Sequence, residues 1–378
     1  MNHRKYWLWL TRLPGIGYKK LKILLNTFKT PYTLYYAKAE TIALCMQHPV
    51  FDKKDLKTLL DARDLKSLIA YEKRLEALNI QYVTIRDEDY PTQLFSLFDP
   101  PFVLYYRGKL LEHPLSIGMV GSRNCTTYGR KVAEYYAEQL AINKVNIISG
   151  MARGIDSYSH IGALKGEGFT TAILGCGINV CYPKENESLM KTIIQSGCVI
   201  SEYGLDVVPR PGLFPMRNRL ISALSDGILL VEAREKSGSL ITVDFALEYG
   251  KDIFAIPGDV LGGTNRGSNN IVRMGGKPVF SIEDILEEYS IFSTNKHTII
   301  DEIEKTLEEK EKMVYSCISL APVFIDEIAR QIEMSMNELQ FILTKLEIKG
   351  AVIQLPNKYY IRDHPRGSKV NAVISEGI

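Results

Sequence analysis

The sequence predicts an α/β protein in which an extended, Rossmann-like parallel sheet is flanked by an N-terminal helical domain and a C-terminal winged helix. Three observations predict this class. Apolar residues recur at helical spacing over residues 1–85, apolar strands alternate with glycine-rich loops and helices over 86–290, and three helices precede a hairpin over 300–362. The polar segment 291–299 is expected to be a linker, and 363–378 a mobile tail.

The helical domain opens with a short glycine motif, Leu13-Pro14-Gly15-Ile16-Gly17, followed by Lys19 and Lys20. Glycine–apolar–glycine between two helices resembles the turn of a helix-hairpin-helix or SAM-like domain, whose backbone N–H groups at a helix start hold a DNA phosphate. A plain helix–helix turn uses the same glycines only for their backbone freedom. The sequence leaves both interpretations open.

The central segment contains the strand signals. Each apolar run is short, and most are followed by glycines and then by a helical pattern, which indicates a parallel sheet with helices on both faces. The expected strands are residues 116–120, 146–149, 170–174, 198–201, 227–231 and 253–256.

The C-terminal segment has the element order of a winged helix-turn-helix. Helices are expected over 313–319, 325–333 and 336–349, and a hairpin over 351–362. A DNA-reading helix usually presents Arg, Lys, Asn or Gln at its start. Here the third helix offers amides and the acidic Glu338, with no Lys or Arg before Lys345. The composition therefore favours a protein-contact or regulatory role over duplex reading.

Composition and charge exclude several classes. Lys+Arg 46 against Asp+Glu 44 leaves a net charge of only +2, so an anion site must come from local clustering. No early segment resembles a membrane span or a secretory signal, so a cytoplasmic protein without membrane contact is expected. The six cysteines form no CxxC pair, which favours reduced, buried thiols over a metal site or a disulfide framework.

The loops after the strands carry the cations. In an open parallel sheet, ligands bind beyond the carboxyl ends of the strands. The loops 121–124, 150–156 and 232–239 would bring Arg123, Arg153, Arg234 and Lys236 to one rim, beside glycines and helix N-termini. Such a rim suits the phosphates of a nucleic acid or of a nucleotide.

A second cluster is Phe214-Pro215-Met216-Arg217-Asn218-Arg219. An aromatic ring beside arginines and an amide supplies the stacking surface and the phosphate donors of a single-strand binding site. An ordinary first turn of a helix with solvated arginines is the alternative. The neighbouring cationic loops favour the binding interpretation.

Nucleotide cofactors are not expected. The segment 175–180 lacks the third glycine of a GxGxxG fingerprint, and no Walker A loop is present. We therefore predict no cofactor and no metal.

A series of ordered motifs resembles the extended Rossmann domain of the DNA-processing protein A family (DprA, also called Smf). The motifs are GMVGSR at 118–123, SGMARGID at 149–156, LGCG at 174–177, YP at 182–183, SEY at 201–203, FPMRNRLI at 214–221, SGSLIT at 237–242, PG at 257–258 and NRGSN at 265–269.

This resemblance implies a homodimeric recombination mediator of natural transformation. Such a protein binds and protects incoming single-stranded DNA and helps to load the RecA recombinase past single-strand-binding protein. The resemblance places Arg123, the arginines of 214–219 and the loop 150–154 against the DNA. Together with the local arguments above, the candidate DNA-binding residues are Gly121, Ser122, Arg123, Gly150, Arg153, Gly154, Phe214, Arg217, Asn218, Arg219 and Lys236.

An enzymatic alternative comes from phosphoribohydrolases of the LOG type, which share the fold. Aligning Gly238-Ser239 with their glycine–threonine pair places Thr242 where their catalytic glutamate stands. Asp156 and Asp244 are nearby carboxylates, more simply explained as capping or solvated residues. We therefore expect a binding protein without catalytic residues. A nucleoside-phosphate enzyme or sensor, and a duplex-specific regulator, remain as alternatives.

Overall fold

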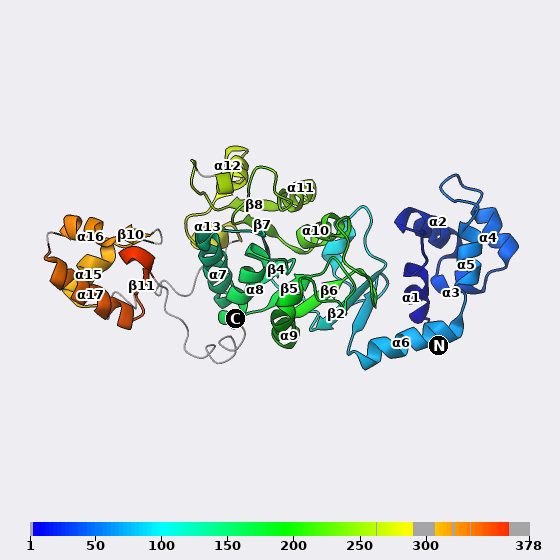
Figure 1. The fold of residues 1–378 in the computed structure, drawn as a ribbon. Helices are drawn as coiled ribbons and strands as arrows, with labels where there is room; N and C mark the ends of the chain where they lie inside the picture. The colour runs from blue at the N-terminus through cyan, green and yellow to red at the C-terminus, as the bar shows by residue number, and fades with distance from the viewer. Residues whose placement is uncertain (1–2, 262, 290–306, 320–321, 333, 363–378) are drawn as a thin grey trace. The chain divides into compact units, whose positions relative to one another are not determined.

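The computed structural model describes residues 3–261, 263–289, 307–319, 322–332 and 334–362 (Figure 1). The chain divides into two compact units, Met1–Ile285 and Leu286–Ile378. The expected linker 291–299 and tail 363–378 lie outside the described residues. The proposed domain boundary near residue 85 falls inside the first unit and stays a prediction.

Six helices form the N-terminal part of the first unit. Their apolar faces share one hydrophobic core with the sheet region, and this core includes Leu8, Leu24 and Leu59 of the helices as well as Leu174 and Ile178 after β5. The helices are α1 (Lys5–Thr11), α2 (Tyr18–Phe28), α3 (Pro31–Tyr36), α4 (Ala39–Cys45), α5 (Asp55–Asp61) and α6 (Leu65–Ala77).

Nine strands of the described chain form one sheet with the order β1-β2-β6-β5-β4-β3-β7-β8-β9. From β6 to β9 all neighbours are parallel, whereas β1 and β2 add an antiparallel edge. The strands are β1 (Gln81–Thr84), β2 (Val103–Gly108), β3 (Ser116–Val120), β4 (Asn146–Ser149), β5 (Thr170–Ile173), β6 (Cys198–Ser201), β7 (Gly227–Leu230), β8 (Asp252–Ala255) and β9 (Lys277–Pro278).

All six strands expected from the sequence are present to within one residue at each end. The edge strands β1 and β2 were not expected, because no glycine loop and helix follow them as they follow the parallel strands.

Helices cover both faces of the sheet (Figure 1). The first three crossovers place α7 (Thr127–Ile142), α8 (Ile155–Lys165) and α9 (Glu187–Ser196) next to one another. The chain then crosses to the other face, where α10 (Leu213–Leu224) packs on α11 (Leu240–Glu248). After β8 come α12 (Arg266–Arg273) and α13 (Glu283–Leu286). Short 3₁₀ turns of the first unit lie at Thr92–Ser96, Lys184–Asn186 and Gly263–Asn265, and a fourth, Glu287–Tyr289, lies just past the boundary between the units.

The second unit is a winged helix with its own core, built on Ile328, Leu339 and Leu346. The expected three helices and hairpin are confirmed, and a short third strand, not expected, pairs with the hairpin. Its elements are α15 (Glu309–Ser316), β10 (Val323–Phe324), α16 (Ile325–Ile332), α17 (Met336–Ile348), β11 (Val352–Leu355), a 3₁₀ turn (Pro356–Lys358) and β12 (Tyr359–Arg362).

All six cysteines are free thiols, three of them buried and three half-buried. No helix in the described ranges has the length and apolar character needed to cross a bilayer.

One buried histidine of α8 is held by a hydrogen bond to the sheet. The Nδ1 atom of His160 lies 2.7 Å from the hydroxyl of Thr170, which itself donates to the carbonyl of Ile147. Since the hydroxyl has one proton, His160 Nδ1 is the donor and Nε2 carries no proton. Burial, with a contribution from Arg217, lowers the pKa of His160 to about 3.

We predict that this histidine makes folding pH-dependent. Its folded pKa lies below its unfolded value, so the neutral ring contributes stability above pH ~6.5 that is lost as the pH falls toward 3. This difference between the folded and unfolded pKa of His160 corresponds to roughly 4–5 kcal/mol of folding free energy. Urea unfolding of His160→Gln between pH 7 and 4 should show a weaker pH dependence than wild type, with exposed His48→Gln as the control. An unchanged pH dependence in His160→Gln would contradict the assignment.

Candidate functional site

A pocket of about 590 Å³ opens at the carboxyl edge of the sheet, at the end of β3. In the sheet β3 lies between β4 and β7, and the chain continues from β3 to β4 but reaches β7 only later. Loops diverge at such a switch point and leave a crevice between them. We call it the strand-end pocket. Its lining comes from the end of β3 and the loop after it (residues 120–124), Ala152 and Asp156 after β4, Tyr182, and residues 209–211. α10 adds Phe214, Pro215, Arg217, Asn218 and Ile221, and the segment after β7 adds Arg234, residues 236–239, Ile241 and Thr242.

Two of the loops are locked together by their backbones. The N–H of Ile155 donates to the carbonyl of Ser122 at 3.2 Å. Gly154 has φ +74°, and a Cβ there would lie 2.2 Å from that same carbonyl oxygen. Only glycine satisfies both conditions, so Gly154 fixes the course of the loop that carries Arg123.

A buried glutamate, which the sequence did not single out, orients the same loop. Glu232 lies two residues after the end of β7, and its carboxylate accepts hydrogen bonds from the N–H of Thr126 at 3.0 Å and from the Thr126 hydroxyl at 2.5 Å. Its backbone oxygen accepts from the N–H of Ser122 at 2.7 Å. The signal that could have located it is an acid immediately after a fully apolar run.

The base of the pocket is a buried guanidinium. Arg217 is only 3% exposed and donates to the carbonyl of Gly150 at 2.6 Å and to the carbonyl of Ile173. A Cβ at position 150 would lie 2.4 Å from the guanidinium, so a larger residue there would displace the end of the Arg217 side chain. Burial lowers the pKa of Arg217, and the nearby Asp156 carboxylate opposes that shift.

Asp156 is the one carboxylate among the residues that line the pocket. It accepts the N–H of Ala152 at 3.3 Å. Burial raises the pKa of Asp156, whereas the Arg217 charge acts to lower it. Arg217 and Asp156 therefore partly compensate each other, and the Arg123 charge also acts on Asp156.

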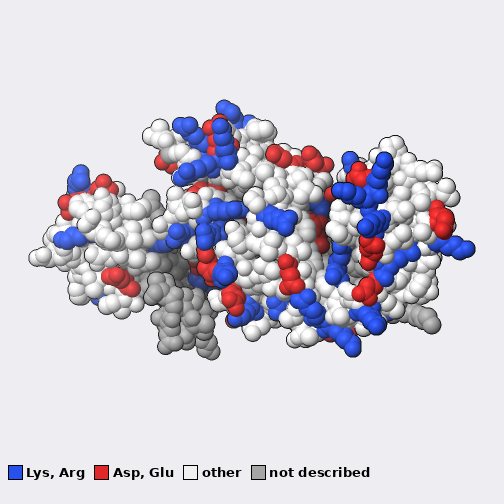
Figure 2. Space-filling model, turned by 45° about the vertical axis from the view of Figure 1, so that its right-hand side comes forward, with Lys and Arg blue, Asp and Glu red and all other residues white. Residues whose placement is uncertain are grey.

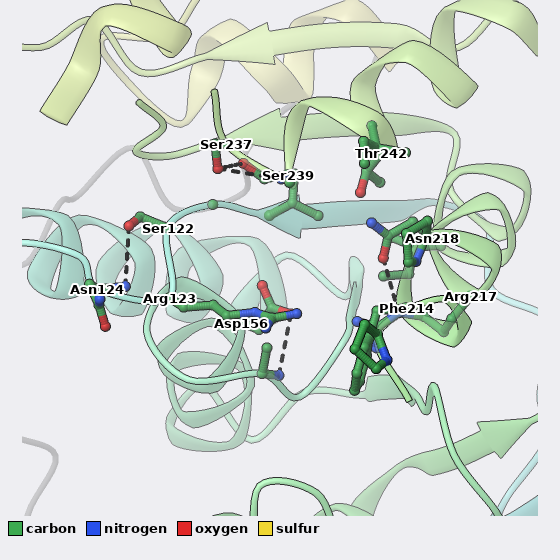
Figure 3. Close-up of a pocket in the computed structure, with 18 of the residues that line it drawn as sticks. Ser122, Arg123, Asn124, Asp156, Phe214, Arg217, Asn218, Ser237, Ser239 and Thr242 are labelled. Carbon is green, nitrogen blue, oxygen red and sulfur yellow. Dashed lines mark hydrogen bonds between the residues drawn. The ribbon is translucent and has the colours of Figure 1, made fainter. Parts of the chain in front are cut away.

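The mouth of the pocket is cationic and aromatic. Arg123 extends across the pocket toward Phe214, while Ser239 and Thr242 lie on the opposite wall (Figure 3). The Arg123 guanidinium lies 5.3 Å from the centre of the Phe214 ring, and Tyr182 packs against the same ring at 5.5 Å. Four lining cations are exposed, namely Arg123, Arg210, Arg234 and Lys236.

The structure divides the expected site residues into two groups. Those that line the pocket are Gly121, Ser122, Arg123, Phe214, Arg217, Asn218 and Lys236. Gly150, Arg153, Gly154 and Arg219 lie outside its lining. Further lining residues that the sequence did not single out as binding residues are Asn124, Tyr182, Arg210, Ser237, Ser239 and Thr242.

Two of the expected arginines are occupied elsewhere. Arg153 is exposed and pairs with Glu185 at 2.8 Å. Arg219 is buried, 2.5 Å from Glu202 and 3.6 Å from Asp99. Burial raises the pKa of Glu202, and the Arg219 charge opposes this rise. These contacts make Arg219 part of a buried ion-pair network rather than of the pocket surface.

Positive charge on the visible face lies in small groups among acidic residues, not in a continuous band (Figure 2). This agrees with the near-neutral composition and leaves the strand-end pocket to supply its own local field. In the part of the chain that the structure describes, no group of three or more His, Cys, Asp or Glu side chains converges as metal ligands would.

Comparison with known proteins assigns the family. The model of DNA recombination-mediator protein A matches residues 81–290, and that of the DprA winged helix domain matches residues 301–358. The chain belongs to this family. Protein Smf of Synechocystis sp. is 29% identical over 398 residues, which cover 96% of this chain and 99% of that relative.

Two solved structures of the family are similar to this one. The X-ray structure of DNA processing protein A from Streptococcus pneumoniae has a TM-score of 0.66 and 32% identity, covering 76% of this chain and 99% of that one. The Helicobacter pylori protein has a TM-score of 0.51 and 32% identity over 55% of this chain and 95% of that one. That structure concerns the single-stranded DNA binding mode of the H. pylori protein.

The third helix of the winged helix, α17, exposes apolar side chains among polar ones, namely Met336, Phe341 and Ile348 beside Asn337, Gln340, Thr344 and Glu347. Phe341 and Ile348 are exposed, and Lys345 lies over the Phe341 ring and 3.6 Å from Glu308. Glu338 pairs with Lys310 at 2.6 Å. The expectation that this helix does not read duplex DNA stays a prediction.

We predict that Arg219 stabilises the fold and does not contact DNA. Arg219→Ala leaves Glu202 buried without its cation and should lower the free energy of unfolding by about 3 kcal/mol. Urea unfolding measures this, and Arg210→Ala, which removes an exposed arginine of the pocket, should change it by less than about 0.5 kcal/mol. Full stability of Arg219→Ala combined with a loss of DNA binding would restore the role expected from the sequence.

Proposed function

We propose that this chain binds single-stranded DNA in the strand-end pocket without chemical turnover. The observation that carries the proposal is the mouth of the pocket, whose lining combines four exposed cations with the Phe214 ring, over which Arg123 lies. Phosphates bind to such cations in a salt-dependent way, and unstacked bases bind to aromatic faces with little preference for sequence.

The aromatic pair favours single strands over duplex. Tyr182 and Phe214 pack against each other with ring centres 5.5 Å apart, and Arg123 lies over the same ring. A base reaches this group only when it is not held in a duplex stack. The related H. pylori protein, with its single-stranded DNA binding mode, supports the same ligand here.

The absence of turnover rests on the chemistry of the lining. Thr242, at the position of the hydrolase glutamate, has no titratable group there, and its carbonyl accepts the Ser222 hydroxyl at 2.7 Å. Asp156 is buried, holds the N–H of Ala152 and lies beside the Arg217 charge. Neither residue provides an accessible general acid or base.

We further propose that the chain acts as a recombination mediator of natural transformation in the cytoplasm. In that role it would work as a homodimer, take over DNA from single-strand-binding protein and help to load RecA. The family membership supports a mediator. A homodimer is supported by the exposed apolar residues around α12, because Val260, Leu261, Met274 and Phe280 are four of the six most exposed large apolar side chains in the described chain.

Arg123→Ala is predicted to weaken binding of a fluorescein-labelled poly-dT oligonucleotide by about tenfold or more. The loss of one phosphate contact should also reduce the slope of log affinity against log salt by about 0.7. Fluorescence anisotropy at two salt concentrations, with an unlabelled duplex of equal length as competitor, measures both effects.

Arg153→Ala is the matched control, because Arg153 has the same charge but pairs with Glu185 outside the pocket lining. Wild-type affinity of Arg123→Ala would remove Arg123 from the binding site. Steady release of base or phosphoribose from nucleoside phosphates by the purified protein would instead favour a hydrolase.

A further inference from the structure

A second hollow, of about 430 Å³, lies where the N-terminal helices meet the segment before β2. The start of α2 contributes Gly17, Tyr18, Lys19 and Lys20, and the segment before β2 contributes Phe98 and Asp99. We call it the Phe98 hollow.

The hollow contains an exposed aromatic ring. Phe98 is 77% exposed. Among the large apolar side chains of the described residues, only Leu261 and Ile348 are more exposed, and Val260 is equally exposed. The Lys22 ammonium lies 6.0 Å from the Phe98 ring centre and 5.8 Å from that of Tyr18. Tyr18 in turn stacks on Phe102 at 5.1 Å with an interplanar angle of 19°, which holds it in place. An accessible ring with a lysine above it has the composition of a base-stacking site.

The charge around the hollow favours a polyanion. Lys20 pairs with Asp55 at 2.8 Å and with Asp52 at 3.3 Å, so its charge is compensated. In the described ranges no carboxylate lies within ion-pair distance of Lys19 or Lys22.

The start of α2 adds to this field. No side chain caps it, and its first turn contains no acid. At Gly17 even an added Cβ would meet no atom within 4 Å, so a ligand can approach the backbone there.

The hollow is connected to the strand-end pocket through α10. Asp99, at its edge, lies 3.6 Å from Arg219. Arg219 comes two residues after Arg217, which lines the pocket, so the two buried side chains leave α10 on different faces. α10 therefore contacts both the strand-end pocket and the edge of the hollow, and both sites belong to the same compact unit.

We propose that the Phe98 hollow is a second stacking subsite for the same single strand, which continues from the strand-end pocket. A base stacks on Phe98, and the flanking phosphates bind to Lys19, Lys22 and the first N–H groups of α2. This proposal rests on the proposed function and extends it to the path of the DNA. It also gives the glycine motif before α2 a role in binding a single strand rather than a duplex.

The test is a comparison of two DNA lengths. Labelled poly-dT of about 6 nucleotides fits one site, and about 20 nucleotides spans both. Phe98→Ala should bind the longer oligonucleotide about tenfold more weakly than wild type and the shorter one equally well, whereas Phe98→Tyr should keep wild-type affinity for both. Arg123→Ala should weaken both lengths.

Phe95→Ala is the matched control, because Phe95 is an exposed phenylalanine three residues away that does not line the hollow. Equal affinity of Phe98→Ala and wild type for the long oligonucleotide would overturn the proposal, as would a Phe98→Ala defect confined to duplex DNA. If wild-type protein binds neither length, the proposed function itself fails. If it binds both and only the Phe98 comparison shows no effect, the hollow alone is excluded.

Discussion

The buried guanidinium of Arg217 is the interaction on which the pocket depends. A buried cation is stable only when its donors are satisfied and a counter-charge is close. Here the carbonyls of Gly150 and Ile173 accept its protons, and Asp156 supplies the negative charge. These partners come from the ends of β4 and β5 and from the start of α8, so a single side chain of α10 joins three segments of the sheet edge.

Around this buried group, the residues that hold the loops in place differ from the exposed residues that can contact a ligand. Glu232 and Gly154 hold the loop after β3 from below, and Arg219 joins α10 to Glu202 and Asp99. Arg123 is thereby carried on a loop that is fixed at several points. Preorganised loops reduce the conformational entropy that a ligand must overcome on binding.

Arg217 and Arg219 show why the site was only partly predictable. They lie in one motif and look equivalent in the sequence, yet one forms the base of the pocket and the other a buried ion pair. The difference depends on which acids lie near each guanidinium, and Asp156, Glu202 and Asp99 are 61, 17 and 120 residues away along the chain. Local composition holds no information about such distant partners.

The sequence by itself determined the parallel sheet, the winged helix and the cationic loops, because apolar runs, glycines and helix periodicity are local signals. The tertiary structure alone decided the antiparallel edge, the role of Glu232, and which cations line the pocket. It also brought Phe98 next to α2, from a segment some 80 residues further along the chain. These outcomes depend on contacts between distant segments, which form only when the chain folds.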